Sequence, residues 1–583
     1  MKKKFPPSPL IFSPGGGEGR VRGRFLLFFI LVLGFGLRMW GIGFGLPDLY
    51  HADEPALVLH ALAHGTGDLN PHYFKLPAFL NYYLCTWFGI YFVFGKITGW
   101  FPTLEAFIVH FLEDPTAIYL IGRAVTGLCG GVLGVYLIYR LGLLVTSTSK
   151  AILAAFFLSV CFLHVRDSHY VIYDIPLTTA LTACLIVLSL LTEKGKLRDY
   201  MAFGILAGLT TAIKYNGALI LAPFLLAHWL RLQAQKAPWR EILFHRSLWA
   251  GLFFTLMGYA MGSPFSLIDF KTFWPDFWIQ ARSEGSWGFF HHLQYSLREG
   301  MGVPLLTAGL GGILLFLFSD SGSKKVIASF VILWLIYLGL YSQPYERYAL
   351  PVTPFLCLGA SELVGTTLDR LRLNHRIAWG FTGVVIVAIP FSYSLYSDYL
   401  FAQKDVRTMA REWVERNIPS GSKIALDYPF YQPRLRFTKG QLIEKRELIR
   451  GSHSELQSLR LKILLKNFDE AKPNYQLFFL DEGDPEKRPL FSRPTIPFAW
   501  EALQKKRIGY LLITRLSSQY EKPEFYERVR KEGRLIQRLS PYRDLSITQG
   551  LARFRQTAAA TEGTDLFARI RFGDIIEIYQ IGR

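Results

Sequence analysis

The stretch FLLFFILVLGFGLRMWGIGFGL at residues 25–46, followed by Tyr50-His51-Ala52-Asp53-Glu54-Pro55, decides the fold. The apolar run is as long as a helix must be to cross the hydrocarbon core of a bilayer. Basic residues precede it and favour a cytoplasmic N-terminus: Lys2, Lys3, Lys4, Arg20, Arg22 and Arg24. We therefore expect Asp53 and Glu54 to emerge on the extracytoplasmic side. Because ionised groups at a membrane boundary are costly to desolvate, the pair predicts a functional site.

The composition indicates a membrane protein rather than a soluble one. Of the 583 residues, 51% are hydrophobic and only 19% are charged, and the apolar residues come in long blocks. The net charge of +19 is spread over short basic clusters between these blocks instead of forming one patch. This distribution argues against nucleic acid as a partner and fits topology signals and contact with membrane lipids.

The apolar blocks predict a polytopic α-helical membrane protein with about 11–13 spans. Besides 25–46, the candidate spans are 118–142, 150–166, 173–192, 199–213, 216–231, 248–262, 303–319, 325–342, 346–366 and 377–397. Basic clusters fall in alternate loops, and this alternation places Lys194, Lys324 and Arg372 in the cytoplasm. We predict a multi-pass protein of the inner (plasma) membrane.

Segment 78–98 is long enough to span, but one crossing there would place every later basic cluster outside. We therefore interpret 47–117 as one large external loop with interfacial helices. Two crossings, with 104–113 returning, remain an alternative. A second external loop, 263–302, is rich in aromatic residues, which could rest on the membrane surface or line a substrate entrance.

The chain divides into three parts. Residues 1–24 form a basic cytoplasmic N-terminus, and 25–397 form the membrane domain. Residues 398–583 are charged, with an amphipathic helix predicted over 405–417 and strands over 423–427, 510–514 and 575–581. By the parity of the spans, this C-terminal α/β domain is extracytoplasmic.

The predicted external side gathers carboxylates and cations near the lipid surface. They are Asp53, Glu54, Asn70, His72, Lys75, Arg166, Asp167, His169, Asp174, Lys214, Tyr215, Glu346, Arg347 and Tyr348. A carboxylate can act as a general base, and Lys or Arg can hold a phosphate. This combination suits a reaction in which a lipid phosphate leaves while an acceptor is deprotonated.

Four motifs in this order resemble the GT-C glycosyltransferases, and among them the protein O-mannosyltransferases and the ArnT-like aminoarabinose transferases. They are FGLPDLYHADEP at 44–55 with NPHYFKLPAFLNYYL at 70–84, Arg166-Asp167-Ser168-His169 through Tyr173-Asp174-Ile175-Pro176, GLTTAIKY at 208–215, and Glu346-Arg347-Tyr348-Ala349-Leu350-Pro351 with Pro354. The resemblance covers roughly residues 25 to 400.

The resemblance implies an inverting transfer of a sugar from a polyprenyl-phosphate donor to a protein, lipid or cell-surface glycan acceptor. Asp53 would be the base, Glu54 would orient the acceptor or a nearby cation, and Asp174 would be a second carboxylate. The candidates for holding the substrate and its phosphate are Lys75, Arg166, Lys214, Arg347 and Tyr348.

Each of these residues also has a simpler interpretation. Asp53, Glu54 and Asp174 could cap helices, since each precedes or begins a helical pattern that contains proline. Lys214 could extend towards the interface from an apolar span, and Arg347 with Tyr348 could anchor the chain in the headgroup region.

No cofactor is required by these motifs, although His51, His72 and the acids could bind a divalent metal. Two other classes of function remain open. A transporter or flippase of lipid-linked sugars also needs many spans and polar membrane residues. An assembly factor with an inactive membrane domain is the third possibility, and the intact acid pair argues against it.

Overall fold

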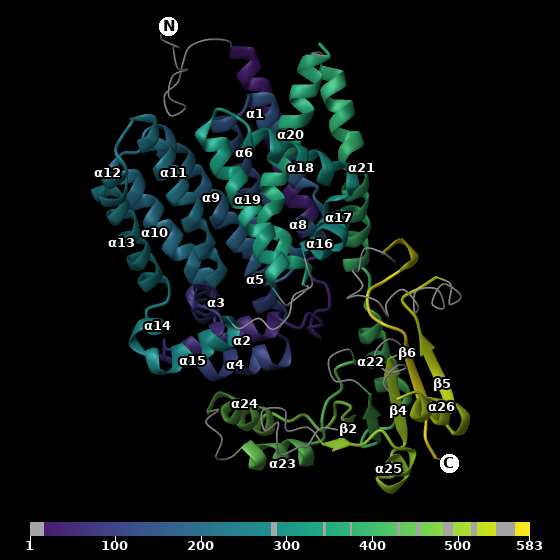
Figure 1. Ribbon diagram of the computed structural model, residues 1–583. Helices are drawn as coiled ribbons and strands as arrows, with labels where there is room; N and C mark the ends of the chain where they lie inside the picture. The colour runs from purple at the N-terminus through teal and green to yellow at the C-terminus, as the bar shows by residue number, and fades with distance from the viewer. Residues whose placement is uncertain are drawn as a thin grey trace.

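The computed structural model describes residues 17–281, 289–341, 345–372, 376–427, 432–449, 455–481, 494–514, 522–543 and 566–582. Most of the predicted basic N-terminus and residues 282–288 of the predicted aromatic loop lie outside these ranges. A helical bundle occupies one end of the molecule, and a smaller domain with a sheet occupies the other (Figure 1).

Most helices of the bundle match the predicted apolar blocks. The bundle helices are α1 (Gly17–Met39), α5 (Thr116–Gly127), η2 (Leu128–Gly134), α6 (Val135–Val145), α7 (Thr148–Ser159), α8 (Phe162–Asp167), α9 (Asp174–Glu193), α10 (Leu197–Ile213), η3 (Tyr215–Ile220), α11 (Leu221–Ala234), α12 (Trp239–Phe244), α13 (Arg246–Gly262), η4 (Leu293–Leu297), α17 (Arg298–Met301), α18 (Val303–Leu317), α19 (Gly322–Leu340), η5 (Glu346–Val352), α20 (Thr353–Arg370) and α21 (Arg376–Phe401). Of these, α12, η4 and α17 lie in segments predicted as loops.

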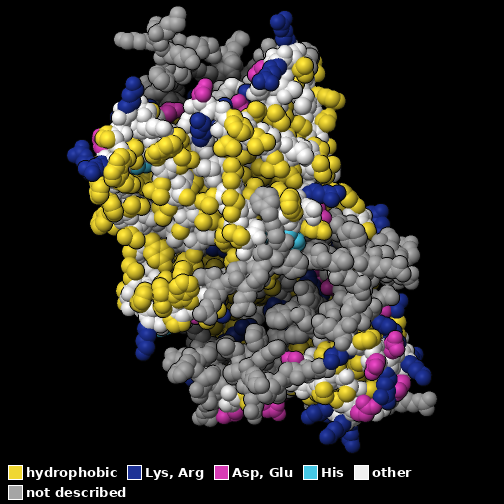
Figure 2. Space-filling view, in the orientation of Figure 1, with side chains coloured by type: hydrophobic (Ala, Val, Ile, Leu, Met, Phe, Trp, Pro, Cys, Tyr) yellow, Lys and Arg dark blue, Asp and Glu magenta, His cyan; other side chains and the backbone are white. Residues whose placement is uncertain are grey.

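The surface of the bundle is apolar, as a lipid-facing surface must be. Figure 2 shows hydrophobic side chains covering the bundle, whereas charged side chains gather on the sheet domain. Among the described residues, six helices are long and apolar enough to cross a membrane, or seven if one bent pair is counted as a span. The predicted polytopic helical fold is thus confirmed.

Two predicted spans differ in detail from the structure. The first helix ends at Met39 rather than at residue 46, because Gly41 and Gly45 adopt positive φ angles of 84° and 64° that end the helix. The predicted span 150–166 is divided between α7 and α8, which are separated by Val160 and Cys161. Both breaks lie at the end of the bundle that carries Asp53.

Several helices lie at the lower end of the bundle in Figure 1. They are α2 (Glu54–Ala63), η1 (His64–Thr66), α3 (Phe79–Ile97), α4 (Leu104–Glu113), α14 (Phe265–Ile268) and α15 (Phe270–Ala281), whereas α16 (Phe289–His292) packs against α19 and η4. Helix α3 covers the ambiguous segment 78–98, and it is not among the candidate membrane spans found in the described residues. That finding is compatible with the interfacial interpretation of 47–117.

The C-terminal domain contains a six-stranded sheet, and its α/β class is confirmed. The strands are β1 (Lys423–Leu426), β2 (Gln476–Leu480), β3 (Thr495–Ile496), β4 (Tyr510–Thr514), β5 (Arg534–Leu539) and β6 (Ile576–Gln580), in the order β3-β2-β1-β4-β6-β5. The first four run parallel, whereas β6 pairs antiparallel with β4 and β5. The helices are α22 (Val406–Asn417), α23 (Lys439–Ile449), α24 (Glu455–Lys466), α25 (Trp500–Lys505) and α26 (Pro523–Glu532), with the short η8 (Leu566–Ala568).

The period-two alternation of the strands gives the sheet two buried faces. Ile424 and Leu426 pack with Val406 and Val414 of α22 on one face, whereas Ala425 packs in the cluster on the other. Helix α22 begins at an N-cap, Asp405, whose carboxylate accepts the Arg407 backbone N–H. The core of the sheet therefore fixes α22.

The sheet domain is docked on the end of the bundle where α2 and α4 lie. Phe44 contacts Phe401 and Phe572, with ring centroids 4.9 and 5.3 Å apart. Lys466 of α24 pairs with Glu105 of α4, with 2.5 Å between Nζ and Oε1. The two domains thus meet at the segment that carries the predicted acid pair.

Candidate active site

Four charged side chains from distant parts of the chain form one connected cluster. Arg347 Nη2 lies 3.1 Å from Asp53 Oδ2, and Arg347 Nε lies 3.8 Å from Asp174 Oδ2. Lys214 Nζ donates a hydrogen bond of 2.7 Å to Asp174 Oδ1. Two cations and two carboxylates from the predicted set thus lie in one cluster.

Each member of the cluster stands at a helix end. Asp53 is the N-cap of α2, Asp174 is the first residue of α9, and Lys214 is the C-cap of α10. Arg347 belongs to η5, which packs between α9 and α20. The bundle therefore presents the four charges at the end where its helices stop and polar groups can meet water.

Exposure separates the two carboxylates. The Asp53 side chain is 49% exposed, whereas that of Asp174 is 4% exposed. The Asp53 carboxylate also makes no cap hydrogen bond with α2, so helix capping does not account for it. Asp53 is thus open to solvent, whereas Asp174 contacts both cations from the buried side.

Aromatic rings enclose the cations. Lys214 Nζ lies 4.2 Å from the Tyr348 ring centroid, and the Arg347 guanidinium lies 4.2 Å from that of Tyr345. Burial lowers the pKa of Lys214, and the neighbouring Asp174 partly opposes this effect. The ring contacts and the Asp174 pair stabilise two charges close together, which is the arrangement expected of a polyanion site.

Glu54 points away from the cluster. Its carboxylate is fully buried and accepts two hydrogen bonds from Arg123, of 2.8 and 2.6 Å, and one of 2.9 Å from the Val171 backbone N–H. Arg123 also donates to the carbonyl groups of Ile42 and Phe44. Glu54 thus ties α2 to α5, and the structure does not place it beside the other predicted site residues.

Arg166 lies behind the cluster rather than in it. Its guanidinium is nearly buried and contacts Asp167 Oδ1 at 2.8 Å and Glu346 Oε2 at 2.5 Å. Since Glu346 immediately precedes Arg347, Arg166 fixes the start of η5. Its contacts suit a positioning residue more than a phosphate ligand.

Lys75 stands apart from the four charges. Within the described ranges it makes no ion pair, and its ammonium group lies 5.9 Å from the Tyr73 ring. The carbonyl of the preceding Phe74 accepts a hydrogen bond of 2.7 Å from Tyr215, the residue after Lys214. Lys75 is thus next to the site without being held by it.

The sequence suggested no role for Arg123 or Tyr345, and His51 was considered only as a possible metal ligand. Arg123 could have been suspected, because a lone arginine in an apolar span needs a buried partner. The His51 ring stacks on Tyr170 with 4.1 Å between centroids, and burial lowers the pKa of His51 despite the nearby carboxylates. A neutral His51 therefore precedes Asp53.

The described residues include no group of three His, Cys, Asp or Glu side chains that could hold a metal ion. His72 pairs with Asp68 at 2.8 Å on an exposed turn rather than with Asp53. The cationic groups of the described cluster are the lysine and the arginine, Lys214 and Arg347.

Comparison with known proteins identifies a related family over part of the chain. Residues 98–260 match the family described as dolichyl-phosphate-mannose-protein mannosyltransferase. The matched segment includes Asp174 and Lys214 but neither Asp53 nor Arg347. A search of the curated proteins found no match.

Solved structures are similar to this chain at low sequence identity, and the first of the three shows a shared fold. ArnT from Cupriavidus metallidurans is 11% identical with a TM-score of 0.50, and the match covers 89% of this chain and 97% of that one. An oligosaccharyltransferase from Archaeoglobus fulgidus is 13% identical with a TM-score of 0.48, and the coverage is 86% and 70%. A Saccharomyces cerevisiae Pmt1–Pmt2 complex bound to its sugar donor is 20% identical over 43% of this chain and 34% of that one, with a TM-score of 0.33.

Proposed function

We propose that this chain, a membrane glycosyltransferase of the GT-C fold, moves a sugar from a polyprenyl-phosphate donor to an acceptor with Asp53 as general base. The observation that carries the proposal is the position of Arg347, whose guanidinium contacts both the exposed Asp53 and the buried Asp174. A base and a phosphate-binding cation thus lie in one cluster.

The phosphate of the donor would bind to Arg347 and Lys214. Both side chains carry positive charge next to each other, and Asp174 holds them from the buried side. When the bond between the sugar and the phosphate breaks, negative charge develops on the leaving oxygen. Cations already in position stabilise that charge without reorganising, and this is the main source of catalysis in such a site.

Asp53 would take the acceptor proton. In the structure its carboxylate is paired with Arg347. An incoming phosphate competes for the same guanidinium, and Asp53 is then free to accept the proton from a hydroxyl or amine. The acceptor oxygen or nitrogen attacks the anomeric carbon from the side opposite the phosphate, and this displacement inverts the configuration.

Two findings support a polyprenyl-phosphate donor. The matched family is described by its use of dolichyl-phosphate-mannose, and the segment that matches contributes Asp174 and Lys214 to the cluster. The bundle that carries the cluster also exposes many apolar side chains, and the lipid chain of such a donor would remain in the membrane beside them (Figure 2). The acceptor would be a protein, a lipid or a glycan.

The extracytoplasmic location of the site is part of the proposal. It is supported by the alternation of basic loops along the sequence and by the cluster lying at the end of the bundle opposite the N-terminus (Figure 1). A transporter or flippase is not favoured, because the family match and the fold both point to transferases.

The test is incubation of the purified protein with a panel of polyprenyl-phosphate sugars and candidate acceptors. We expect one donor class to release free polyprenyl phosphate, and only when acceptor is present. At a subsaturating donor concentration, the Arg347→Ala variant should release roughly 10- to 100-fold less. Transbilayer movement of the intact donors without cleavage would instead support a flippase.

A further inference from the structure

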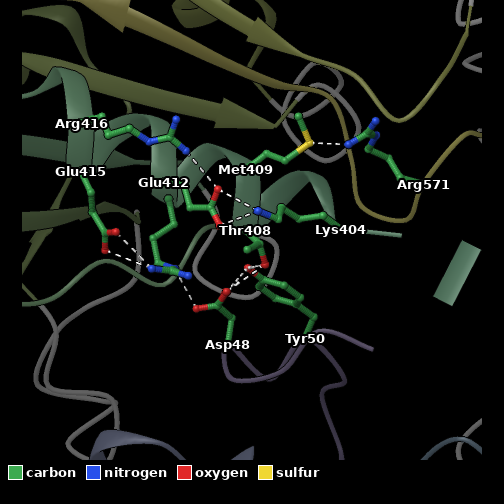
Figure 3. A network of polar contacts seen from close by, with 10 residues as sticks. Asp48, Tyr50, Lys404, Thr408, Met409, Glu412, Glu415, Arg416 and Arg571 are labelled. Carbon is green, nitrogen blue, oxygen red and sulfur yellow. Dashed lines mark hydrogen bonds and ion pairs between the residues drawn. The ribbon is translucent and has the colours of Figure 1, made fainter. Parts of the chain in front are cut away.

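The three residues Asp48, Leu49 and Tyr50, which precede Asp53 by only a few positions, are held by the C-terminal domain. Figure 3 shows Asp48 and Tyr50 from the membrane domain facing Thr408 and its neighbours on α22. The contacts join residues about 360 positions apart in the chain, since Asp48 bonds to Thr408. They lie in the segment that leads from α1 to Asp53.

Asp48 is the centre of these contacts. Its carboxylate is nearly buried and accepts hydrogen bonds from the hydroxyl groups of Thr408 at 2.8 Å and Tyr50 at 3.0 Å. Arg411 Nε lies 2.9 Å from Asp48 Oδ1, but its N–H does not point at that oxygen, so this contact is an ion pair without a well-directed hydrogen bond. Arg411 is held in turn by Glu415, one turn along α22.

Tyr50 and Leu49 add two further contacts. The Arg407 guanidinium lies 3.9 Å from the Tyr50 ring centroid and is fixed by two hydrogen bonds to Asp405, of 2.9 and 2.8 Å. Arg434 donates a hydrogen bond of 2.9 Å to the Leu49 carbonyl. The loop is therefore held through its backbone and through both polar side chains.

Asp53 lies between this set of contacts and a second anchor. On its other side, the buried pair of Glu54 and Arg123 fixes the first turn of α2. The Asp53 side chain itself makes no cap hydrogen bond, so the backbone on either side decides where its carboxylate stands. One anchor belongs to the bundle and the other to the C-terminal domain.

We propose that the C-terminal domain positions a residue of the active site. Its side chains Arg407, Thr408 and Arg411 hold Asp48 and Tyr50. This contact places Asp53 opposite Arg347. We call these five residues the α22 clamp. The inference rests on the proposed role of Asp53 and extends it to a domain that contributes none of the four clustered charges.

Loosening the α22 clamp should change the kinetic parameters in a way that the loss of a purely structural contact would not. The described cations for the donor phosphate, Arg347 and Lys214, come from the bundle, so loosening the loop should leave donor affinity unchanged. The base would be displaced, and a displacement of about 1 Å can cost roughly 100-fold in rate. We therefore expect loss in kcat with little change in the donor KM.

The test compares Arg411→Ala and Thr408→Val with a matched control, Arg416→Ala, in the full-length protein. Arg416 lies on the same helix, but its partner Glu412 is also on α22, and neither contacts the loop. We expect kcat to fall about tenfold or more in the first two variants and to stay unchanged in the control. Arg411→Lys should recover part of the loss.

Hydrogen exchange of the peptide 45–56 provides a readout that does not depend on activity. We expect faster exchange there in Arg411→Ala and Thr408→Val, with bundle and sheet peptides unchanged, and no change in Arg416→Ala. If the wild type is active and both clamp variants show unchanged exchange and unchanged kcat, the proposed role of the α22 clamp is wrong. Absence of transfer by the wild type, with the exchange result intact, would overturn the proposed function instead.

Discussion

Removal of the Arg347 guanidinium is the perturbation whose effect can be worked out most fully. The side chain is 23% exposed, contacts Asp53 at 3.1 Å and Asp174 at 3.8 Å, and stands over the Tyr345 ring. Arg347→Ala would delete one charged partner of the donor phosphate. Loss of one such hydrogen bond costs about 1.5–3 kcal/mol, which corresponds to roughly 10- to 100-fold in donor affinity.

The fold should survive this change, because the carboxylates left behind have other partners. Asp174 keeps its hydrogen bond of 2.7 Å to Lys214, and the half-exposed Asp53 can be solvated by water. Arg347→Lys should recover donor binding only in part, since an ammonium group cannot donate two parallel hydrogen bonds to a phosphate.

The assay is a donor titration in nanodiscs with the acceptor held saturating. We expect a raised donor KM in Arg347→Ala and an intermediate value in Arg347→Lys. An unchanged donor KM together with a raised acceptor KM would assign Arg347 to the acceptor pocket and refute the reasoning.

Three further predictions follow from the same geometry. Because burial lowers the pKa of Lys214 from 10.5, Lys214 should lose its charge, and the enzyme its donor affinity, as pH rises through that lowered value. In a titration of donor affinity from neutral to alkaline pH, Lys214→Arg should move this loss to higher pH. Arg123→Ala should cost about 3–5 kcal/mol of stability by leaving Glu54 buried and unpaired, seen as a lower melting temperature or lost expression rather than a selective fall in kcat. The third prediction concerns which side of the membrane each domain faces, and it uses a Cys85→Ser background. A cysteine in place of the exposed Arg416 should react with an impermeant thiol reagent on intact cells, whereas a cysteine in place of Asp320 should react only after permeabilisation. The reverse pattern would contradict the proposed extracytoplasmic location of the C-terminal domain.

The sequence was sufficient to predict the bundle, because long apolar runs have few alternatives to membrane helices. The period-two patterns at 423–427, 510–514 and 575–581 likewise identified β1, β4 and β6. Helix ends were less certain, since the glycines after Met39 end α1 inside an apolar run whose hydropathy does not change.

The acid pair shows where sequence reasoning reached its limit. Asp53 and Glu54 are adjacent, but one is the N-cap of α2 and the other is the first residue of the helix, so their side chains leave the backbone in different directions. Which carboxylate meets Arg347 and which meets Arg123 depends on how α2 packs against α5 and η5. That packing is a tertiary property that no local pattern contains.

The contact between Asp48 and α22 was equally hidden. Asp48 is one acidic residue in a turn, and Thr408 and Arg411 are ordinary polar positions of an amphipathic helix. Their pairing depends on how the sheet domain docks on the bundle, which brings residues about 360 positions apart into hydrogen-bond distance.

The turnover of Asp53→Asn tests the central claim most directly. Asparagine keeps the size of the side chain but cannot accept the acceptor proton, so we expect turnover to fall by about two to four orders of magnitude while donor binding is retained. Asp68→Asn is the matched control, because Asp68 is an exposed acid in the same loop that pairs with His72. Near-normal turnover in Asp53→Asn would contradict the account and remove Asp53 from the mechanism.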